Sequence, residues 1–392
     1  MGTARPRVLF YVQHLLGIGH LMRARRIALA LHENNFSVTL VTGGLPVSGF
    51  ELPGVEQIAL PAMAVRDGNF SDLVDANGST VDNSFKVARC KRLLDAYSHV
   101  HPDIVVLEAY PFGRRQLRFE LLPLIEAIQS SQPKPLLVCS VRDLLQRNRK
   151  AGRDEETANL LNQYFDKVLV HGDANFATLE ETFPLAQAIA DKIVYTGLVS
   201  GPTPCVSSES FDIVVSAGGG AVGSALLRTT MQAVPLLPDT TSWCVIAGPY
   251  LAQAEFDELV SSAPANVTLQ RFRADFVSLL TKASLSISQA GYNTVSDILQ
   301  AGCRALLLPF SSQGETEQTD RAVRLNKLGL ATVLHNDVMS NNSLSGRKLA
   351  DAVRDAMQLN ALTKAAALNV DGANGTAIIL QNLLQNRHGQ QS

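Results

Sequence analysis

The chain has 392 residues, of which 46% are hydrophobic and 18% are charged, and its formal net charge is -2. This length predicts two or three domains at about 150 residues each, and the near-neutral charge argues against a nucleic-acid binder, which would carry a basic excess. Five scattered cysteines without a CxxC pair are typical of a reducing compartment rather than of a disulfide framework or a zinc site.

The sequence contains no apolar run of about 18 residues, the length that a membrane-spanning helix needs. The apolar run Val8–Val12 is too short for a signal peptide. The basic run 142–153 could touch an anionic membrane surface, although such a run is more often a solvated face. We therefore expect a cytoplasmic protein with at most peripheral contact at the inner face of the membrane.

The first half of the chain alternates short β-rich runs with helical stretches, which predicts parallel βαβ units. The expected strands are Val8–Val12, Ser37–Val41, Ile104–Leu107, Leu136–Ser140 and Lys167–Val170. The expected helices are Leu21–His32, Phe85–Val100, Phe119–Ser130 and Glu155–Phe165. We expect residues 64–84 to form a loop.

A stretch rich in Gly, Pro and Ser, residues 199–210, predicts a linker. After it the alternation restarts, with expected strands at Phe211–Ser216, Ser242–Ala247, Val267–Leu269, Ser284–Ser288, Ala305–Pro309 and Ala331–Leu334. The pattern predicts an α/β chain with two doubly wound, Rossmann-like domains, 1–198 and 211–370. A C-terminal helix and tail, 371–392, would pack back on the first domain.

Polar and glycine residues gather where the expected strands end. In the first domain they are His14, Gly17, Gly19, His20, Glu108, Arg142 and Asp143, and in the second they are Gly218, Gly219, Gly220 and Gln289 to Thr294. Open parallel sheets bind ligands beyond the carboxyl ends of their strands. We therefore expect the two domains to face each other across a cleft and to share one ligand.

The glycine loop 218–223 matches the dinucleotide fingerprint G-x-G-x-x-G. A nicotinamide cofactor would also need an acid at the end of the next strand, where this chain has Ala247, Gly248 and Pro249. The P-loop, nucleophile-elbow and H-E-x-x-H motifs and a D-x-D pair do not occur either. We expect neither a cofactor nor a catalytic metal.

Residues 286–325 combine a small-residue turn, a carboxylate one helical turn later and an acid–amide pair. The residues concerned are Gly291, Asn293, Thr294, Asp297, Ala301, Gly302, Pro309, Glu317 and Gln318. This pattern resembles the donor-binding region of GT-B glycosyltransferases, especially the family 28-like bacterial enzymes that add N-acetylglucosamine to a lipid-linked muramyl peptide. The N-terminal stretch 8–24 is similar to a group of bacterial predicted glycosyltransferases. Two departures are Gln289, where many relatives are basic, and Arg304, where the pattern has proline.

The resemblance implies a GT-B fold and an inverting, metal-independent transfer from a nucleotide-diphosphate sugar, a UDP-sugar above others, to a hydroxyl acceptor. Its donor diphosphate would meet Gly218, Gly219, Gly220, Gln289, Gly291, Asn293 and Thr294. The ribose would meet Asp297, the sugar hydroxyls Glu317 and Gln318, and the nucleobase Arg271 and Phe272.

On the acceptor side, the resemblance and the strand-end pattern assign a loop that contains His14, Gly17, Gly19 and Arg142. An inverting transfer needs a base for the acceptor hydroxyl. His20 ranks first, as base or as a diphosphate contact, followed by Asp143 and then Glu108. The acceptor stays open, either lipid-linked or a small molecule. Two other functions stay open as well: a sugar-nucleotide epimerase or hydrolase on the same fold, and a non-catalytic nucleotide-sugar binder.

Overall fold

The computed structural model describes residues 5–15, 17–47, 49–66, 69–147, 150–202, 207–218, 223–249, 251–310, 316–335, 344–358 and 368–389. The chain divides into two compact units. Unit 1 consists of residues 1–199 together with 371–392, and unit 2 consists of residues 200–370. None of the helices within these described ranges has the length and apolar content needed to cross a bilayer.

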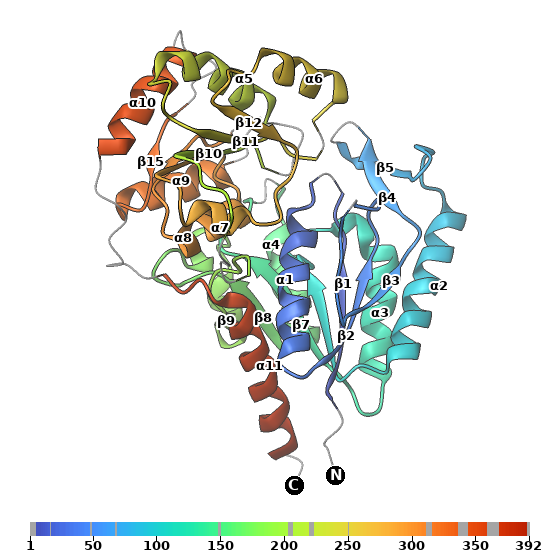
Figure 1. Cartoon of the computed structure of the whole chain (residues 1–392). Helices are drawn as coiled ribbons and strands as arrows, with labels where there is room; N and C mark the ends of the chain where they lie inside the picture. The colour runs from blue at the N-terminus through green and yellow to red at the C-terminus, as the bar shows by residue number, and fades with distance from the viewer. Residues whose placement is uncertain are drawn as a thin grey trace. The chain divides into compact units, whose positions relative to one another are not determined.

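Unit 1 is built on a seven-stranded parallel sheet with the order β3-β2-β1-β6-β7-β8-β9 (Figure 1). The strands are β1 (Arg7–Val12), β2 (Ser37–Thr42), β3 (Glu56–Ala59), β6 (Ile104–Glu108), β7 (Leu136–Arg142), β8 (Lys167–His171) and β9 (Ile193–Tyr195). In the central strand β1, Val8 to Val12 are fully buried, because helices cover both faces of the sheet.

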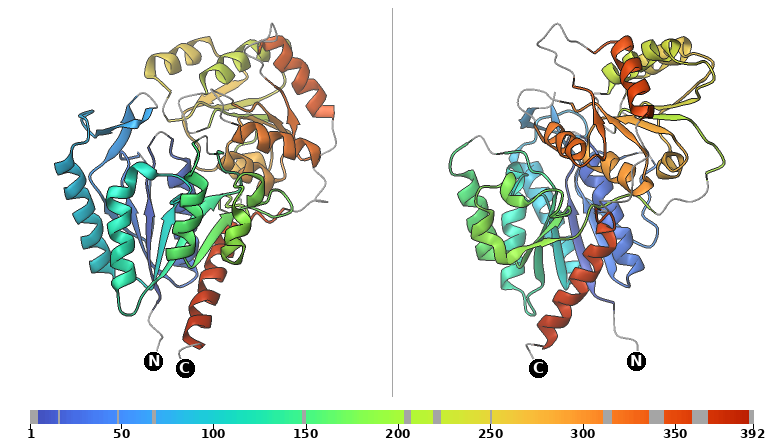
Figure 2. Two further views of the ribbon diagram at one scale, coloured as in Figure 1. Left: turned by 180° about the vertical axis from the view of Figure 1, so that it is seen from behind. Right: turned by 90° about the vertical axis from the view of Figure 1, so that its left-hand side faces the viewer.

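The helices of unit 1 are α1 (Gly19–Glu33), α2 (Asn83–Val100), α3 (Arg118–Ser130), α4 (Arg153–Tyr164) and α11 (Gly372–Gly389). Helices α2, α3 and α4 pack on one face of the sheet, and α1 and α11 lie side by side on the other (Figures 1 and 2). The five strands and four helices expected in this half of the chain are confirmed to within a few residues at each end.

The expectation of a loop at 64–84 is wrong. Strands β4 (Met63–Arg66) and β5 (Asn69–Asp75) form an antiparallel hairpin in which Val65 pairs with Leu73. Such short strands give too few apolar–polar alternations to stand out in a sequence. The edge strands β3 and β9 were also missed, because they are short as well. Neither is fully buried, so neither shows a continuous apolar run.

Unit 2 is a six-stranded parallel sheet with the order β12-β11-β10-β13-β14-β15. Its strands are β10 (Ile213–Ser216), β11 (Trp243–Ile246), β12 (Val267–Gln270), β13 (Leu285–Ser288), β14 (Ala305–Leu307) and β15 (Thr332–Val333). Its helices are α5 (Ser224–Ala233), α6 (Gln253–Ser262), α7 (Phe276–Leu280), α8 (Tyr292–Ala301), α9 (Glu317–Lys327) and α10 (Gly346–Gln358). All six expected strands are present, and the two doubly wound sheets confirm the expected α/β class.

Each sheet reverses its strand order once, between β1 and β6 in unit 1 and between β10 and β13 in unit 2. Chain segments leave such a pair of strands in opposite directions, which opens a crevice at the carboxyl ends where ligands bind. Most of the polar and glycine residues listed from the sequence follow these four strands, and Arg142 and Asp143 follow the next strand, β7. The topology therefore directs attention to these two crevices.

Candidate functional site

A buried carboxylate, Glu108, lies at the end of β6, beside the reversal of strand order in unit 1. Its side chain is 0% exposed and forms an ion pair with Arg23 of α1. Ser140 of β7 donates its hydroxyl to Oε2 of Glu108, and Nδ1 of His20 lies 2.9 Å from Oε1. Helix α1 presents both His20 and Arg23 because residues three apart share one helix face. Four side chains from three elements thus converge at the point where the strand order reverses.

The hydrogen bonds of His20 indicate which of its ring nitrogens carries the proton. Nδ1 faces Oε1 of Glu108 at 2.9 Å and Nη2 of Arg23 at 3.3 Å. A carboxylate oxygen opposite a lone pair would be repelled, whereas Arg23 already donates to Glu108. We therefore assign the proton to Nδ1, which donates to Glu108 and leaves a lone pair on Nε2.

The electrostatics of this cluster keep His20 neutral and Glu108 ionised at pH 7. Burial, followed by the charge of Arg114, lowers the pKa of His20 to about 3. Burial also opposes ionisation of Glu108, but the charge of Arg23 and hydrogen bonds from His20 and Ser140 outweigh it and hold the pKa of that carboxyl below its usual range. The imidazole Nε2 is therefore an acceptor at neutral pH.

Of the three bases expected from the sequence, His20 is the one with an accessible side chain, which is 20% exposed. The Glu108 carboxylate is enclosed by its donors. Asp143 is 0% exposed, and its Oδ1 accepts a hydrogen bond from the backbone N–H of Leu144 at 2.8 Å. The backbone of Gly172 packs closely against Asp143, since a Cβ added to Gly172 would lie 2.9 Å from the Cβ of Asp143. Burial argues against either carboxylate as the base.

A buried network of an ion pair and hydrogen bonds, which the sequence analysis missed, anchors the start of the loop after β1. Arg89 of α2 and Glu120 of α3, both 0% exposed, form an ion pair, and Arg89 donates to the side chain of Gln13. Beside it, His14 is 6% exposed and its Nε2 lies 3.0 Å from the carbonyl of Leu45. An arginine and a glutamate on separate predicted helices give no sequence signal of pairing.

The other predicted residues of this loop differ in their surroundings. A Cβ on Gly17 would meet no atom within 4 Å, so packing does not demand glycine there. Gly19 is the first residue of α1, and Arg142 is the last residue of β7. The guanidinium of Arg114 donates to the carbonyl of Gln13 at 3.0 Å, and burial lowers its pKa to about 10.

In unit 2 the turn before α8 has the features of an anion site. Gly291 is the N-cap, with φ -67° and ψ 146°, and it supplies no side-chain cap. Asn293 and Thr294 fall in the first turn of the helix, and Gln289 follows β13. Backbone N–H groups and the positive end of the helix dipole favour a phosphate at such a terminus.

The glycine turn after β10 is described only in part. Gly218 has a φ of +76°, and a Cβ on Gly248 would lie 2.4 Å from the Gly218 carbonyl oxygen, so this close approach of two loops requires glycine at 248. Gly219 and Gly220, which the sequence analysis assigned to the diphosphate, lie outside the described residues.

The three residues expected to contact ribose and sugar are all engaged within unit 2. Asp297 is 4% exposed, and its Oδ1 accepts the backbone N–H of Gly201 at 2.7 Å. Glu317 is 5% exposed and pairs with Arg321 at 2.9 Å. Gln318 accepts the backbone N–H of Phe310 at 3.1 Å. Each of them therefore has a structural partner already.

Arg321, which the sequence analysis missed, links the two donor-side segments of unit 2. It is 0% exposed, donates to Glu317 and also donates to the carbonyl of Ala290 at 2.9 Å. It thereby ties the start of α9 to the turn that precedes α8. The i, i+4 spacing from Glu317 was the available signal.

The two residues expected to contact the nucleobase, Arg271 and Phe272, differ in their exposure and contacts. Arg271 donates to the carbonyl of Leu251 at 2.8 Å and lies 4.3 Å from the centroid of the Phe256 ring, so its guanidinium is held by its own unit. Phe272 is 64% exposed, which leaves an aromatic face available for stacking.

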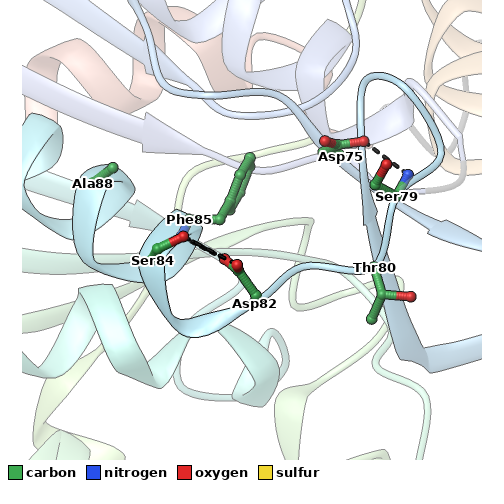
Figure 3. A pocket seen from close by; sticks show the side chains of 7 residues that line it. All are labelled: Asp75, Ser79, Thr80, Asp82, Ser84, Phe85 and Ala88. Atoms are coloured by element: carbon green, nitrogen blue, oxygen red, sulfur yellow. Dashed lines mark hydrogen bonds between the residues drawn. The ribbon is translucent and has the colours of Figure 1, made fainter.

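A surface pocket of about 370 Å³ lies elsewhere in unit 1, between β5 and the start of α2 (Figure 3). Its carboxylates serve local structure. Asp82 caps α2 by accepting from Phe85 N at 2.8 Å, and Asp75 accepts from the backbone of Asn77 and Ser79. None of the predicted site residues lines this pocket.

Within the described ranges, no three His, Cys, Asp or Glu side chains are grouped to hold a metal ion.

The chain shows similarity to known glycosyltransferases. Residues 213–375 match the glycosyltransferase family 28 C-terminal domain. A curated relative is the UDP-N-acetylglucosamine–N-acetylmuramyl-(pentapeptide) pyrophosphoryl-undecaprenol N-acetylglucosamine transferase of Thermotoga maritima, 27% identical over 206 residues. That alignment covers 52% of this chain and 55% of the relative, so the chain spans about half the length of the curated relatives it matches.

Solved structures show the same fold over nearly the whole chain. The calicheamicin glycosyltransferase CalG4 has a TM-score of 0.62 at 17% identity, covering 98% of this chain and 99% of that one. The spinosyn rhamnosyltransferase SpnG, complexed with thymidine diphosphate, has a TM-score of 0.59 at 13% identity, covering 96% and 99%. The chain therefore has the fold of these GT-B glycosyltransferases, and its residues 213–375 are similar to the family 28 C-terminal domain.

Proposed function

We propose that this protein transfers a sugar from a nucleoside-diphosphate sugar to a hydroxyl acceptor with inversion at the anomeric carbon and without a metal ion. The observation that carries this proposal is the partly exposed His20, whose Nδ1 lies 2.9 Å from the buried carboxylate of Glu108. The family 28 domain match supports the donor side of the proposal, and the N-terminus of α8 in unit 2 is suited to bind an anion.

In this reaction the acceptor hydroxyl gives its proton to Nε2 of His20 while its oxygen attacks the anomeric carbon. The bond between that carbon and the diphosphate oxygen breaks on the opposite face, so the configuration inverts. As the imidazole becomes cationic, the carboxylate of Glu108 stabilises the charge through Nδ1–H. The hydrogen bond and the charge of Glu108 raise the pKa of His20 against the lowering by burial, and a positioned base whose pKa lies near the working pH contributes roughly 10²–10⁴-fold to the rate.

The leaving nucleoside diphosphate gains negative charge as the bond breaks. The N–H groups at the start of α8, beginning after the N-cap Gly291, together with the Thr294 hydroxyl, are suited to stabilise it. Glu317 and Gln318 lie at the start of α9, where Arg321 holds Glu317 in place. We propose that these two side chains orient the sugar.

The donor that we propose first is a UDP-sugar, because the Thermotoga maritima relative is named for UDP-N-acetylglucosamine. A thymidine-diphosphate sugar is the rival, since SpnG was solved with that nucleotide. The first acceptor to try is the lipid-linked muramyl pentapeptide in the name of the same relative, and contact with the membrane that holds it would be peripheral. Phe272 is proposed as the stacking face for the base.

Thermal shifts of the full chain with UDP, thymidine diphosphate and GDP, without added metal, test the donor side. One nucleotide at 100 times its Kd should stabilise the protein by about 2.7 kcal/mol. We expect Thr294→Val to lose most of that shift, because the hydroxyl that contacts the diphosphate is removed, and His20→Gln to keep it.

Transfer from the matching nucleotide sugar then tests the base. His20→Gln should lower kcat by about 100-fold or more, and NMR of the product should show the inverted anomer. Retention of configuration, or full turnover by His20→Gln, would contradict the mechanism. A lack of response to all three nucleotides would contradict the proposed donor class.

A further inference from the structure

Arg114 lies in the turn between β6 and α3, and its guanidinium is anchored to the loop after β1. Its Nε donates to the carbonyl of Gln13 at 3.0 Å. Gln13 is itself fixed, since it is 0% exposed and its side chain accepts a hydrogen bond from Arg89 and donates to the carbonyl of Met63 at 3.1 Å. The guanidinium of Arg114 is therefore attached to a rigid part of the loop that leads to α1.

The anchoring bond uses one N–H of this guanidinium, and the other four belong to its Nη1 and Nη2 atoms. Among the residues that the structure describes, none forms a hydrogen bond or an ion pair with these two Nη groups. Because Arg114 is partly exposed, a ligand can reach them. Arg23 and Arg89, which are buried near the same loop, each pair with a glutamate instead. Arg114 thus presents a guanidinium that is fixed at one edge and open at the other.

The charges around Arg114 leave it without a counter-ion of its own. Glu108 is the carboxylate whose charge favours a positive Arg114, but Glu108 already forms an ion pair with Arg23. Burial lowers the pKa of Arg114 to about 10, and the positive charges of Arg142 and Arg23 contribute to the lowering. The charge of Arg114 in turn lowers the pKa of His20, so the two side chains are neighbours. A bound anion would offset this excess of positive charge.

The backbone of the turn that carries Arg114 is strained at two residues. Arg114 has a φ of 61° and a ψ of 27°, in the left-handed region, which is unfavourable for a residue with a Cβ. Ala109, directly after Glu108, has a φ of +64°. Residues held in such conformations cluster at active sites and ligand-binding turns, where the surrounding structure enforces them. The strain therefore supports a binding role for the turn 109–114.

We propose that the two Nη groups of Arg114 bind an anionic group of the acceptor, either a phosphate or a carboxylate. The planar guanidinium matches both groups, because it can donate two parallel hydrogen bonds to their oxygens. This inference rests on the proposed transfer and names the class of acceptor. Such an acceptor presents its hydroxyl to Nε2 of His20 and its negative charge to Arg114. The donor diphosphate is not the expected occupant, because the turn before α8 in unit 2 is proposed for it.

Titration of the full chain, labelled with ¹⁵N-arginine, tests the site without turnover. Inorganic phosphate and acetate are the probes, at an ionic strength held constant with chloride, and the Nε–H signal of Arg114 is assigned as the one missing from Arg114→Lys. We expect this signal to shift with saturation. A response to phosphate alone would identify a phosphoryl acceptor, and a response to acetate alone a carboxylate. No saturable shift with either anion would overturn the proposal, and so would a shift with UDP only, which would assign Arg114 to the donor.

Matched acceptors then test the class by turnover. One pair is N-acetylmuramyl pentapeptide 1-phosphate and its methyl glycoside, and the other is methyl glucuronide and methyl glucoside. For the pair that is used, the charged member should have a kcat/KM at least about tenfold higher, because a hydrogen-bonded charge is lost in the neutral one. Equal use of the charged and the neutral member by the wild type would overturn the proposal.

Arg114→Gln should raise the KM for the charged acceptor about 10- to 100-fold and leave the KM for the donor unchanged. The matched control is Arg92→Gln, which removes the same charge from an exposed position on α2 and should change neither KM. A change in the donor KM in place of the acceptor KM would contradict the assignment. The titration uses the wild type, so it decides the anion site even where Arg114→Gln does not fold.

The two experiments separate this inference from the proposed function. If the wild type transfers sugar to no acceptor, the proposed function fails, and the arginine signal alone then decides whether Arg114 binds an anion. If the wild type transfers sugar to neutral acceptors as well as to charged ones, the proposed function stands and the inference about Arg114 fails.

Discussion

At the scale of single residues, two buried ion pairs of unit 1 lie near the loop after β1. One is the Glu108 cluster beneath His20. The other is the pair Arg89 and Glu120, which together with Tyr11 holds Gln13. Removing one partner of a buried pair leaves a charge without compensation in a low dielectric, whereas an exposed pair has water to replace it.

Arg89→Met should therefore destabilise unit 1 by about 3–5 kcal/mol. The matched control lies on the same helix, where Lys91 and Asp95 form an exposed pair, and Lys91→Met should cost at most about 0.5 kcal/mol. Amide hydrogen exchange in β1 and α2 provides the measurement. Equal protection in the two variants would show that the buried pair contributes no more than a surface pair.

At the scale of elements, α11 returns the end of the chain to unit 1 and packs beside α1 (Figure 2). The Asn34 amide donates to Asn374 at 3.1 Å, and Gln381 donates to the carbonyl of Asn34 at 3.0 Å. The helix begins very close to the backbone after β9, since a Cβ on Gly375 would lie 2.3 Å from the Thr196 carbonyl oxygen. Glycine is required at position 375 because a side chain would clash with the Thr196 carbonyl, and not because of a left-handed backbone conformation.

We expect Gly375→Ala to cost about 1–3 kcal/mol, because the added methyl forces α11 away from Thr196. The melting temperature should fall by about 2–4 °C for each kcal/mol. Gly113→Ala is the control, since its Cβ would make an ordinary contact of 3.6 Å with the carbonyl of Ala109. A Gly375→Ala protein that melts together with Gly113→Ala would contradict the packing argument.

At the scale of the whole molecule, the two units differ in how acid acts on them. Unit 1 contains His14, His20 and His171, whose pKa values are all lowered from the ordinary value of 6.5, chiefly by the loss of water around the rings. The sequence places one histidine in unit 2, His335, and its side chain is exposed. Between pH 6.5 and about 3 the unfolded unit 1 therefore binds protons that the folded unit 1 excludes.

Stability of unit 1 should fall as the pH drops through that window, by up to about 1.4 kcal/mol per pH unit for each such histidine. Below pH 4.5 protonation of Glu108 in the unfolded state adds to the fall, because the pKa of that carboxyl is lowered in the folded state. Hydrogen exchange from pH 7 to 4 should show increasing opening in β1 and β8 but not in β10 and β11. His171→Gln should reduce the slope, and the exposed His99→Gln should not. A uniform response of both units would contradict this account.

Much of this architecture could be predicted from local patterns. Fully apolar strands such as Val8–Val12, each followed by an amphipathic stretch, predict parallel sheets because only strands covered on both faces are apolar throughout. The glycines and the helix start at His20 and Gly291 were likewise predicted from residues adjacent in sequence. The hairpin β4–β5 was missed because its short strands are paired by tertiary contacts rather than by strong periodicity.

The sequence by itself determined the α/β class, the strand-end position of the polar residues and the family resemblance, since each depends on residues close together along the chain. Tertiary structure decided the chemical state of those residues. Glu108 and Asp143 are equally plausible bases in the sequence, and only the fold shows that both are buried and that the side chain of His20 is partly exposed. The fold brings together residues that are far apart in the sequence, such as Arg23 and Glu108, or His171 and Ser140. Their burial and hydrogen-bond partners determine which atoms carry protons, and no local sequence pattern predicts them.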